Sequence, residues 1–236
     1  MSDIAESFGN RLLEQFLGDD GKSEELRRWE ASLRDFLTPA WAILEPSTPF
    51  VSNWHIDCIC EYLEAVYAGQ IRRLIINQPP RTLKSTLITK IFPCWVWTKN
   101  PSLRMMFCSY AATLSEEHSV DRRTLIQSAW YQAHWPEVKL SRDQNVKMQF
   151  SNTARGMMTA TSIGGTSIGK GGDLLVFDDP ISPQQSTSAA ERTRANDWIR
   201  GSFLTRVNNE QTACFLGVMQ RLNEQDTTGI FRYDPA

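Results

Sequence analysis

The sequence predicts an α/β domain whose mainly parallel sheet is covered on both faces by helices. Two observations support this prediction. From residue 71 onward, short apolar runs typical of buried strands alternate with amphipathic stretches typical of helices. The chain has 236 residues, of which 41% are hydrophobic and 22% charged, and this is enough for one α/β domain with a small appendage.

Residues 1–46 are predicted to form a helical segment that precedes the α/β domain. Ser23 can cap a helix that carries Glu24 and Glu25 in its first turn, where the helix dipole favours negative charge. A single apolar stripe with helical spacing follows, formed by Leu26, Trp29, Leu33 and Phe36.

The elements of the domain are predicted from periodicity and from local start and stop signals. Pro93 is expected to kink or end the helix that contains it. Thr113 and Glu116 have the spacing of a capping box, which predicts a helix start. Residues 152–156 read as the turn of a hairpin. We expect strands at 74–77, 104–110, 147–151, 157–162, 174–177 and 213–219, and helices at 55–67 (closed by Gly69), 85–97, 113–128 and 188–207.

One predicted strand leads into a segment with the pattern of a phosphate-binding loop. Residues 73–86 read RLIINQPPRTLKST, an apolar run followed by a Pro-Pro turn and a Lys-Ser-Thr triplet that opens an amphipathic stretch. This is the strand, loop and helix order of a P-loop, in which the Lys reaches the β and γ phosphates and the Ser hydroxyl meets Mg²⁺. The usual glycines, favoured because they accept a positive φ, are replaced by Gln78 and Leu83.

We therefore predict a nucleotide-binding loop despite the missing glycines. Lys84 should neutralise the β and γ phosphates, Ser85 should ligate Mg²⁺, and the backbone N–H of Thr86 should meet the α-phosphate. The alternative is an ordinary helix start, although a Lys at a helix N-terminus opposes the helix dipole unless an anion is present. The predicted nucleotide-binding residues of the loop are Gln78, Pro79, Pro80, Arg81, Thr82, Leu83, Lys84, Ser85 and Thr86.

A second glycine-rich segment matches the consensus better but has the wrong context. Residues 164–171 read GGTSIGKG, which contains G-x-x-x-x-G-K. Gly171 has no hydroxyl for Mg²⁺, and a strand is predicted to begin at Leu174. Because a P-loop must lead into a helix whose N-terminus faces the phosphates, we reject this segment as the nucleotide site.

Another predicted strand ends in two carboxylates. Residues 173–179 read DLLVFDD, and Lys-Ser after one strand with Asp-Asp after another are the two halves of an ATP-hydrolysing site. Asp178 is predicted to hold Mg²⁺ directly or through water. Asp179 is predicted to orient and polarise the attacking water, in a position that Glu usually takes. The alternative is an Asx-turn before Pro180.

With these motifs the chain resembles the ATPase part of bacteriophage terminase large subunits, the motors that pump DNA into empty capsids. The resemblance implies a three-layer α/β/α P-loop NTPase fold of the ASCE type over residues 47–222. It also implies that residues 223–236 begin a linker to a nuclease domain, so that this chain is an isolated ATPase domain without nuclease activity. The matching pieces are Asn53-Trp54-His55-Ile56-Asp57, Pro79-Pro80-Arg81 before Lys84-Ser85, Ser109-Tyr110-Ala111, Gly171-Gly172-Asp173, Asp178-Asp179-Pro180 and Gln220-Arg221-Leu222.

The resemblance implies roles for further residues. Arg81 would contact the γ-phosphate, and Gln220, after the last strand, would sense it and link hydrolysis to movement. Trp54 and His55 would lie near the adenine. The alternatives are an Arg81 that anchors the loop to a carboxylate, a solvated strand end at Gln220 and a core position for Trp54.

Some charged residues have weaker assignments. Arg122 or Arg123 could reach a neighbouring subunit's nucleotide, although a charge pair on a helix is usually solvated. Lys170 could touch DNA phosphate in the pore of a ring.

The resemblance also implies cofactors and partners. These are ATP with Mg²⁺, double-stranded DNA, the portal protein and the small terminase subunit. A homo-oligomeric ring on the portal, typically of five subunits, is expected in the host cytoplasm, while the isolated domain could be monomeric.

Composition excludes some classes of protein. A net charge of −2 is incompatible with a strongly basic DNA-coating protein. The five cysteines form no C-x-x-C pair and fit reduced core thiols, and His55, Cys58 and Cys60 fit structural-zinc spacing poorly. No apolar run approaches the ~20 residues that a membrane helix needs, and no secretory signal is recognisable.

Three other functions are compatible with these motifs. A superfamily-2-like helicase or remodelling ATPase would need a second core domain. A nucleotide-binding assembly module would bind ATP without turnover. A small-molecule kinase would need a substrate lid, for which the sequence gives no sign.

Overall fold

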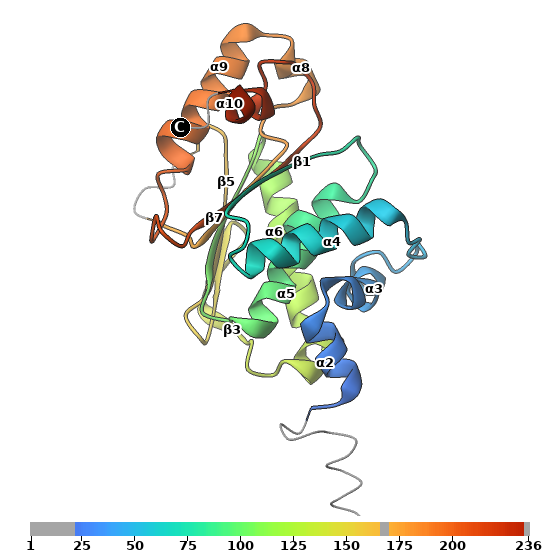
Figure 1. The fold of residues 1–236 in the computed structure, drawn as a ribbon. Helices are drawn as coiled ribbons and strands as arrows, with labels where there is room; N and C mark the ends of the chain where they lie inside the picture. Colours follow the sequence, from blue (N-terminus) through green and yellow to red (C-terminus); the bar gives the residue numbers. More distant parts are fainter. Residues whose placement is uncertain (1–21, 166–169, 234–236) are drawn as a thin grey trace, which may run out of the picture.

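The computed structural model describes residues 22–165 and 170–233 of the chain. The predicted helical content of residues 1–21 and the centre of the rejected glycine-rich segment lie outside these ranges. A seven-stranded sheet occupies the middle of the molecule (Figure 1), with the strand order β1-β7-β6-β2-β5-β4-β3. The strands are β1 (Arg73–Asn77), β2 (Arg104–Ser109), β3 (Leu140–Val146), β4 (Gln149–Asn152), β5 (Met157–Ser162), β6 (Leu174–Asp178) and β7 (Cys214–Met219).

The sheet is mainly parallel, as the sequence predicts. Strands β1, β7, β6, β2 and β5 run in the same direction, whereas β4 is antiparallel to β5 and β3 is antiparallel to β4. Strand β7 separates β1 from β6, the two strands that carry the predicted motifs. This is the strand insertion of an ASCE-type P-loop fold, so the predicted fold class is confirmed.

Helices pack on both faces of the sheet but cover them unequally. Figure 1 shows α3, α4, α5 and α6 beside one face, and α8, α9 and α10 gathered at one end of the molecule. The helical elements are α2 (Glu24–Ala31), α3 (Leu33–Leu44), α4 (Trp54–Tyr67), η1 (Thr86–Ile91), α5 (Phe92–Lys99), α6 (Ala112–Gln127), α7 (Ala129–His134), α8 (Pro183–Ser186), α9 (Ala189–Trp198), η2 (Ile199–Phe203) and α10 (Thr227–Tyr233), of which η1 and η2 are π-helical.

The alternation of side chains along the strands divides the core in two. In β2, Met105 and Phe107 belong to the large cluster beneath α3–α6, whereas Met106 and Cys108 belong to a smaller cluster beneath η2. On the smaller side, a groove of about 770 Å³ remains open over β1 and β7, and Phe215 and Phe231 are among its lining residues. The second face is therefore covered less completely than predicted.

Several local predictions need correction. The apolar stripe of the N-terminal segment is divided between two helices, because Ser32 is extended and caps α3 through its side chain. Thr113 and Glu116 form no capping box: α6 begins one residue earlier, after Ala111, which makes no side-chain cap. Strand β3 was missed because its sequence, LSRDQNV, has no apolar alternation.

Other local predictions are confirmed. The side chain of Ser23 accepts a hydrogen bond from the Leu26 N–H and caps α2. Gly69 has a φ of 72° after α4, as a helix-closing glycine requires. Near Pro93 the helical segment changes from the π-helix η1 to the α-helix α5.

Residues 223–236, which were predicted to begin a linker, include the helix α10. Phe231 of this helix stacks on Phe177 of β6 with ring centroids 5.9 Å apart. Up to Tyr233 the chain is therefore packed on the sheet. The predicted domain boundaries stay predictions.

Candidate active site

The loops that follow β1, β6 and β7 meet at the carboxyl edge of the parallel sheet. The Gln78 N–H donates to the carbonyl of Met219 at 3.1 Å, and the Asp179 N–H donates to the carbonyl of Val218 at 2.9 Å. Strand β7 therefore fixes the two predicted motifs on either side of itself. In open α/β sheets this edge is where ligands bind.

The loop after β1 reaches its conformation without glycine. Arg81 and Leu83 have φ angles of 64° and 65°, the left-handed region that costs most residues about 1–2 kcal/mol. Leu83 packs against the large core cluster, and the Thr82 hydroxyl donates to the Pro79 carbonyl at 2.7 Å. These contacts hold the strained turn that glycines would have made easier.

Lys84 and Ser85, at the end of this loop, contact the carboxylates of Asp178 and Asp179. Lys84 is buried, its Nζ donates to Oδ2 of Asp179, and it lies 3.5 Å from Oδ1 of Asp178. The Ser85 hydroxyl donates to Oδ1 of Asp178 at 3.1 Å. The Gln220 N–H donates to Oδ1 of Asp179 at 3.0 Å, so this residue meets the site through its backbone. Five predicted residues thus converge, four through their side chains and Gln220 through its backbone.

Asp178 is the buried centre of this group, with a relative exposure of 1%. Its Oδ2 accepts a hydrogen bond from the Thr89 hydroxyl at 2.7 Å and lies 3.7 Å from Nδ1 of His118. Burial, followed by the nearby Arg122 and Lys90 charges, lowers the pKa of His118 to about 3, so this imidazole is neutral at pH 7.

Thr89 and His118 were not among the predicted site residues. Thr89 lies four residues after Ser85 and so on the same side of the helical segment, a spacing that could have found it. His118 comes from α6, and no local sequence signal links it to Asp178.

The donor set suits magnesium bound together with a nucleotide. Within residues 22–165 and 170–233, no group of three or more His, Cys, Asp or Glu residues could hold a metal ion by itself. Magnesium in nucleotide sites takes one or two carboxylates and completes its shell with phosphate oxygens and water. The Ser85 hydroxyl and the Asp178 carboxylate, in contact at the loop, are such a partial set.

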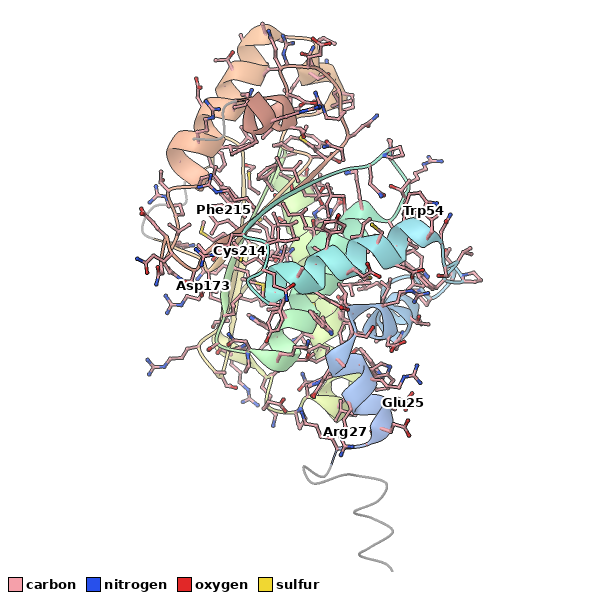
Figure 2. The ribbon with its side chains drawn as sticks, viewed as in Figure 1. Glu25, Arg27, Trp54, Asp173, Cys214 and Phe215 are labelled. Carbon is pink, nitrogen blue, oxygen red and sulfur yellow. The ribbon has the colours of Figure 1, made fainter. Side chains whose placement is uncertain are left out.

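An aromatic groove of about 340 Å³ lies next to the loop, between α4 and β1. Its lining includes Trp54, His55, Tyr62 and Gln78. Figure 2 shows Trp54 at the start of α4, and its side chain is 77% exposed, so it is not a core residue. Nε2 of His55 and Oε1 of Gln78 are buried atoms without a hydrogen-bond partner among the described residues. The groove therefore offers an aromatic wall, and two of its lining residues carry buried polar atoms without a partner.

The remaining candidate residues are placed as follows. Arg81 is exposed, and no carboxylate in the described part of the chain pairs with it. Arg122 is fully buried, with its guanidinium 3.7 Å from the ring centroid of Phe107, so the suggestion that it reaches a neighbouring subunit is wrong. Lys170 donates to Oε1 of Gln149, and the segment that it opens continues into β6, not into a helix.

Fold and site together define an α/β P-loop domain. No protein family model matches the chain, and no curated protein sequence does. Among solved structures, the crystal structure of the HK97 bacteriophage large terminase is similar, with a TM-score of 0.59 over 86% of this chain at 14% identity. This chain spans 40% of that protein. The likeness is one of fold.

In the part of the chain that the structure describes, no helix is long and apolar enough to cross a bilayer.

Proposed function

We propose that this chain is the ATPase part of a DNA-packaging motor, which hydrolyses ATP to move double-stranded viral DNA into a procapsid. The observation that carries the proposal is the convergence of Lys84 and Ser85 with Asp178 and Asp179 at one sheet edge. The fold likeness to a large terminase supports the choice of motor class.

ATP binding would exchange partners at the lysine. Lys84 now pairs with both carboxylates. A triphosphate in the loop supplies stronger negative charge, so Lys84 turns to the β and γ phosphates. Asp179 Oδ2 is then released to accept a hydrogen bond from the attacking water. The contact between the Gln220 N–H and the other oxygen keeps Asp179 oriented.

Ser85 and Asp178 would hold Mg²⁺, and the exposed Arg81 would reach the γ-phosphate. The ion, when bound, neutralises charge on the β and γ phosphates. Arg81 is held in a left-handed conformation three residues before Lys84, with its side chain in solvent, where it can close on a bound nucleotide.

The groove beside the loop fits the base. Adenine carries an exocyclic amine that can donate to Oε1 of Gln78 and ring nitrogens that can accept from His55, once these two side chains turn their buried atoms towards the groove. Trp54 and Tyr62 offer aromatic faces for contact with the purine. Gln78, at the first loop position, thus contacts the base while Lys84 contacts the phosphates.

The wider assembly follows from the motor class. Pumping requires a ring of copies around DNA, with the portal protein and the small terminase subunit as partners, in the cytoplasm of the infected host. A net charge of −2 fits weak DNA affinity for these residues alone, with affinity gained from many copies.

The competing function, an assembly module that binds ATP without turnover, would use the same loop.

Steady-state ATPase measurements test the proposal. We expect Lys84→Ala and Asp179→Asn each to lower turnover by about 10²-fold or more, because each removes a group that acts on the reacting phosphate or water. Lys90→Ala is the matched control, since Lys90 follows in the same helical segment but pairs with Asp121 at 2.6 Å. It should keep turnover near that of the unmodified chain.

Two outcomes would contradict the proposal in different ways. Unchanged turnover in both Lys84→Ala and Asp179→Asn would show that the site lies elsewhere. ATP binding without turnover, with or without DNA and portal, would favour the assembly module.

A further inference from the structure

The two oxygens of Asp178 are held by two hydroxyls from one helical segment. Ser85 donates to Oδ1 at 3.1 Å and Thr89 donates to Oδ2 at 2.7 Å. Thr89 is 1% exposed and the carboxylate is equally buried, so water does not compete for this hydrogen bond. The proposed function assigns a role to Ser85 and leaves Thr89 without one.

Both the side chain and the backbone of Thr89 are held by hydrogen bonds. Its segment, Thr86–Ile91, is a π-helix, a form that occurs mostly as single turns and frequently at functional sites. Its carbonyl accepts a hydrogen bond from Nη1 of the buried Arg122 at 2.8 Å, which ties the segment to α6. The Thr89 hydroxyl itself is held on Asp178 by a 2.7 Å hydrogen bond in the interior of the protein.

Among the described residues, the Thr89 hydroxyl is the side-chain donor that lies within hydrogen-bond distance of Oδ2. Nδ1 of His118 lies 3.7 Å from this oxygen, beyond hydrogen-bond distance. An ionised carboxylate can only accept, so the direction of the bond is set. Without the threonine hydroxyl, Oδ2 would lack a donor and the carboxylate could rotate about its χ2 bond.

We propose that Thr89 is a positioning residue for the magnesium site, which fixes the Asp178 carboxylate with Oδ1 towards Ser85 and the nucleotide loop. This inference rests on the proposed function, because it assigns Asp178 to the metal. Thr89 itself touches neither metal nor nucleotide. Loss of its hydroxyl should therefore lower the affinity of the site for Mg²⁺, so that more Mg²⁺ is needed to support nucleotide binding. Nucleotide binding without metal should be unchanged.

The test is a titration of Mg²⁺ into the full chain with a fluorescent ATP analogue. Removing a partner of a metal ligand commonly costs 10–100-fold in metal affinity, so we expect Thr89→Val to raise the half-maximal Mg²⁺ concentration by about 10-fold or more. Affinity for the analogue in EDTA should stay unchanged. Thr89→Ser keeps the hydroxyl and should restore the Mg²⁺ response to near that of the unmodified chain.

Matched controls separate this role from a loss of packing. Thr98 is also buried, and its hydroxyl donates to the Trp95 carbonyl at 2.7 Å, so Thr98→Val makes the same chemical change away from Asp178. It should leave the Mg²⁺ response unshifted. If Thr89→Val does not fold, Thr89→Ala and Thr89→Ser form a second pair that differs only by the hydroxyl.

The outcomes of the Mg²⁺ titration separate failure of this inference from failure of the proposed function. A folded hydroxyl-free variant at Thr89 with an unshifted Mg²⁺ response would overturn the inference and leave the proposed function intact. Unfolding of both hydroxyl-free variants, with Thr89→Ser folded, would assign the hydroxyl to stability and also overturn it. Absence of Mg²⁺-dependent binding in the unmodified chain would overturn the proposed function, and this inference with it.

Discussion

Arg81 stands in a left-handed turn that usually belongs to glycine, and the same is true of Arg155 in the turn between β4 and β5. Their φ angles are 64° and 68°, and both side chains are exposed. At either position glycine would relieve the backbone but would also increase the freedom of the unfolded chain, and the two effects are of similar size. The two residues therefore form a matched pair in which only the location differs.

Arg81→Gly should separate the side chain's role from that of the backbone. We expect the free energy of unfolding to change by less than about 1 kcal/mol in both Arg81→Gly and Arg155→Gly. An arginine that acts on the γ-phosphate can contribute ~10³-fold to the rate, so ATPase turnover should fall by about that factor in Arg81→Gly alone. Urea unfolding and steady-state turnover measure the two quantities. Equal turnover in the two variants would exclude the assigned role of Arg81.

His118 gives the protein a predicted pH dependence. Its pKa is about 3 in the folded protein, against an ordinary value of 6.5, because the ring is buried. Between these values the unfolded chain binds a proton that the folded chain does not. The free energy of unfolding should therefore decrease as the pH falls below about 6.5, by at most ~1.4 kcal/mol per pH unit. Above pH 6.5, His118 should not make the free energy of unfolding depend on pH.

Urea unfolding between pH 7.5 and 5 measures this effect. The dependence on pH below 6.5 should be shallower in His118→Gln than in the unmodified chain, since the variant has no imidazole to protonate. Parallel profiles would mean that another group causes the loss of stability.

At the scale of elements, α10 and the residues before it connect the segment after β7 to the end of β1. The buried Asp226, just before the helix, accepts hydrogen bonds at 3.1 Å from Nε of Arg221 and the Leu222 N–H through Oδ2, and from the Gly229 N–H through Oδ1. The Thr228 hydroxyl donates to Oδ1 of Asn77, the last residue of β1, at 2.9 Å. This short helix and the residues before it thus contact both the strand that ends before Gln78 and the segment that follows Gln220.

Removal of the Asp226 carboxylate should destabilise the fold. Asp226→Ala leaves several buried donors without an acceptor, for which we expect a loss of about 2–4 kcal/mol in the free energy of unfolding. Asp197→Ala is the control, because Asp197 is exposed on α9 and should change stability by less than about 0.5 kcal/mol. Similar denaturation midpoints for the two variants would show that α10 contributes little to the domain.

At the scale of the whole molecule, a ligand that binds only the folded chain must stabilise it. At a free concentration of 100 times the dissociation constant, Mg-ATP should add about 2.7 kcal/mol and raise the unfolding temperature. GTP should raise it less, because guanine has a carbonyl where adenine has the amine that Gln78 can accept. Thermal unfolding with a non-hydrolysable analogue of each nucleotide measures both effects. Equal shifts with the two analogues would speak against the base groove as assigned.

The residues that meet at the candidate site could be predicted from the sequence because they lie in short motifs at strand ends. In parallel strands the carboxyl ends share one edge, so Lys84, Ser85, Asp178 and Asp179 could be expected at the same edge once the strands were recognised, while the strand order brings them into contact. Arg122 shows the limit of this reasoning. A charged pair on a helix looks solvated from its sequence, yet the structure buries one arginine over an aromatic ring and beneath a carbonyl.

By itself, the sequence determined the class of fold and the two motifs, because apolar periodicity and the residues after each strand are local properties. Tertiary structure alone decided which residues surround Asp178, how a loop without glycine is held and where α10 lies. Thr89 and Thr228 form hydrogen bonds to distant segments of the chain, at Asp178 and Asn77, and His118 comes near Asp178 from α6. Such contacts depend on how helices pack around the sheet, and this packing is a property of the whole chain that no short stretch of it carries.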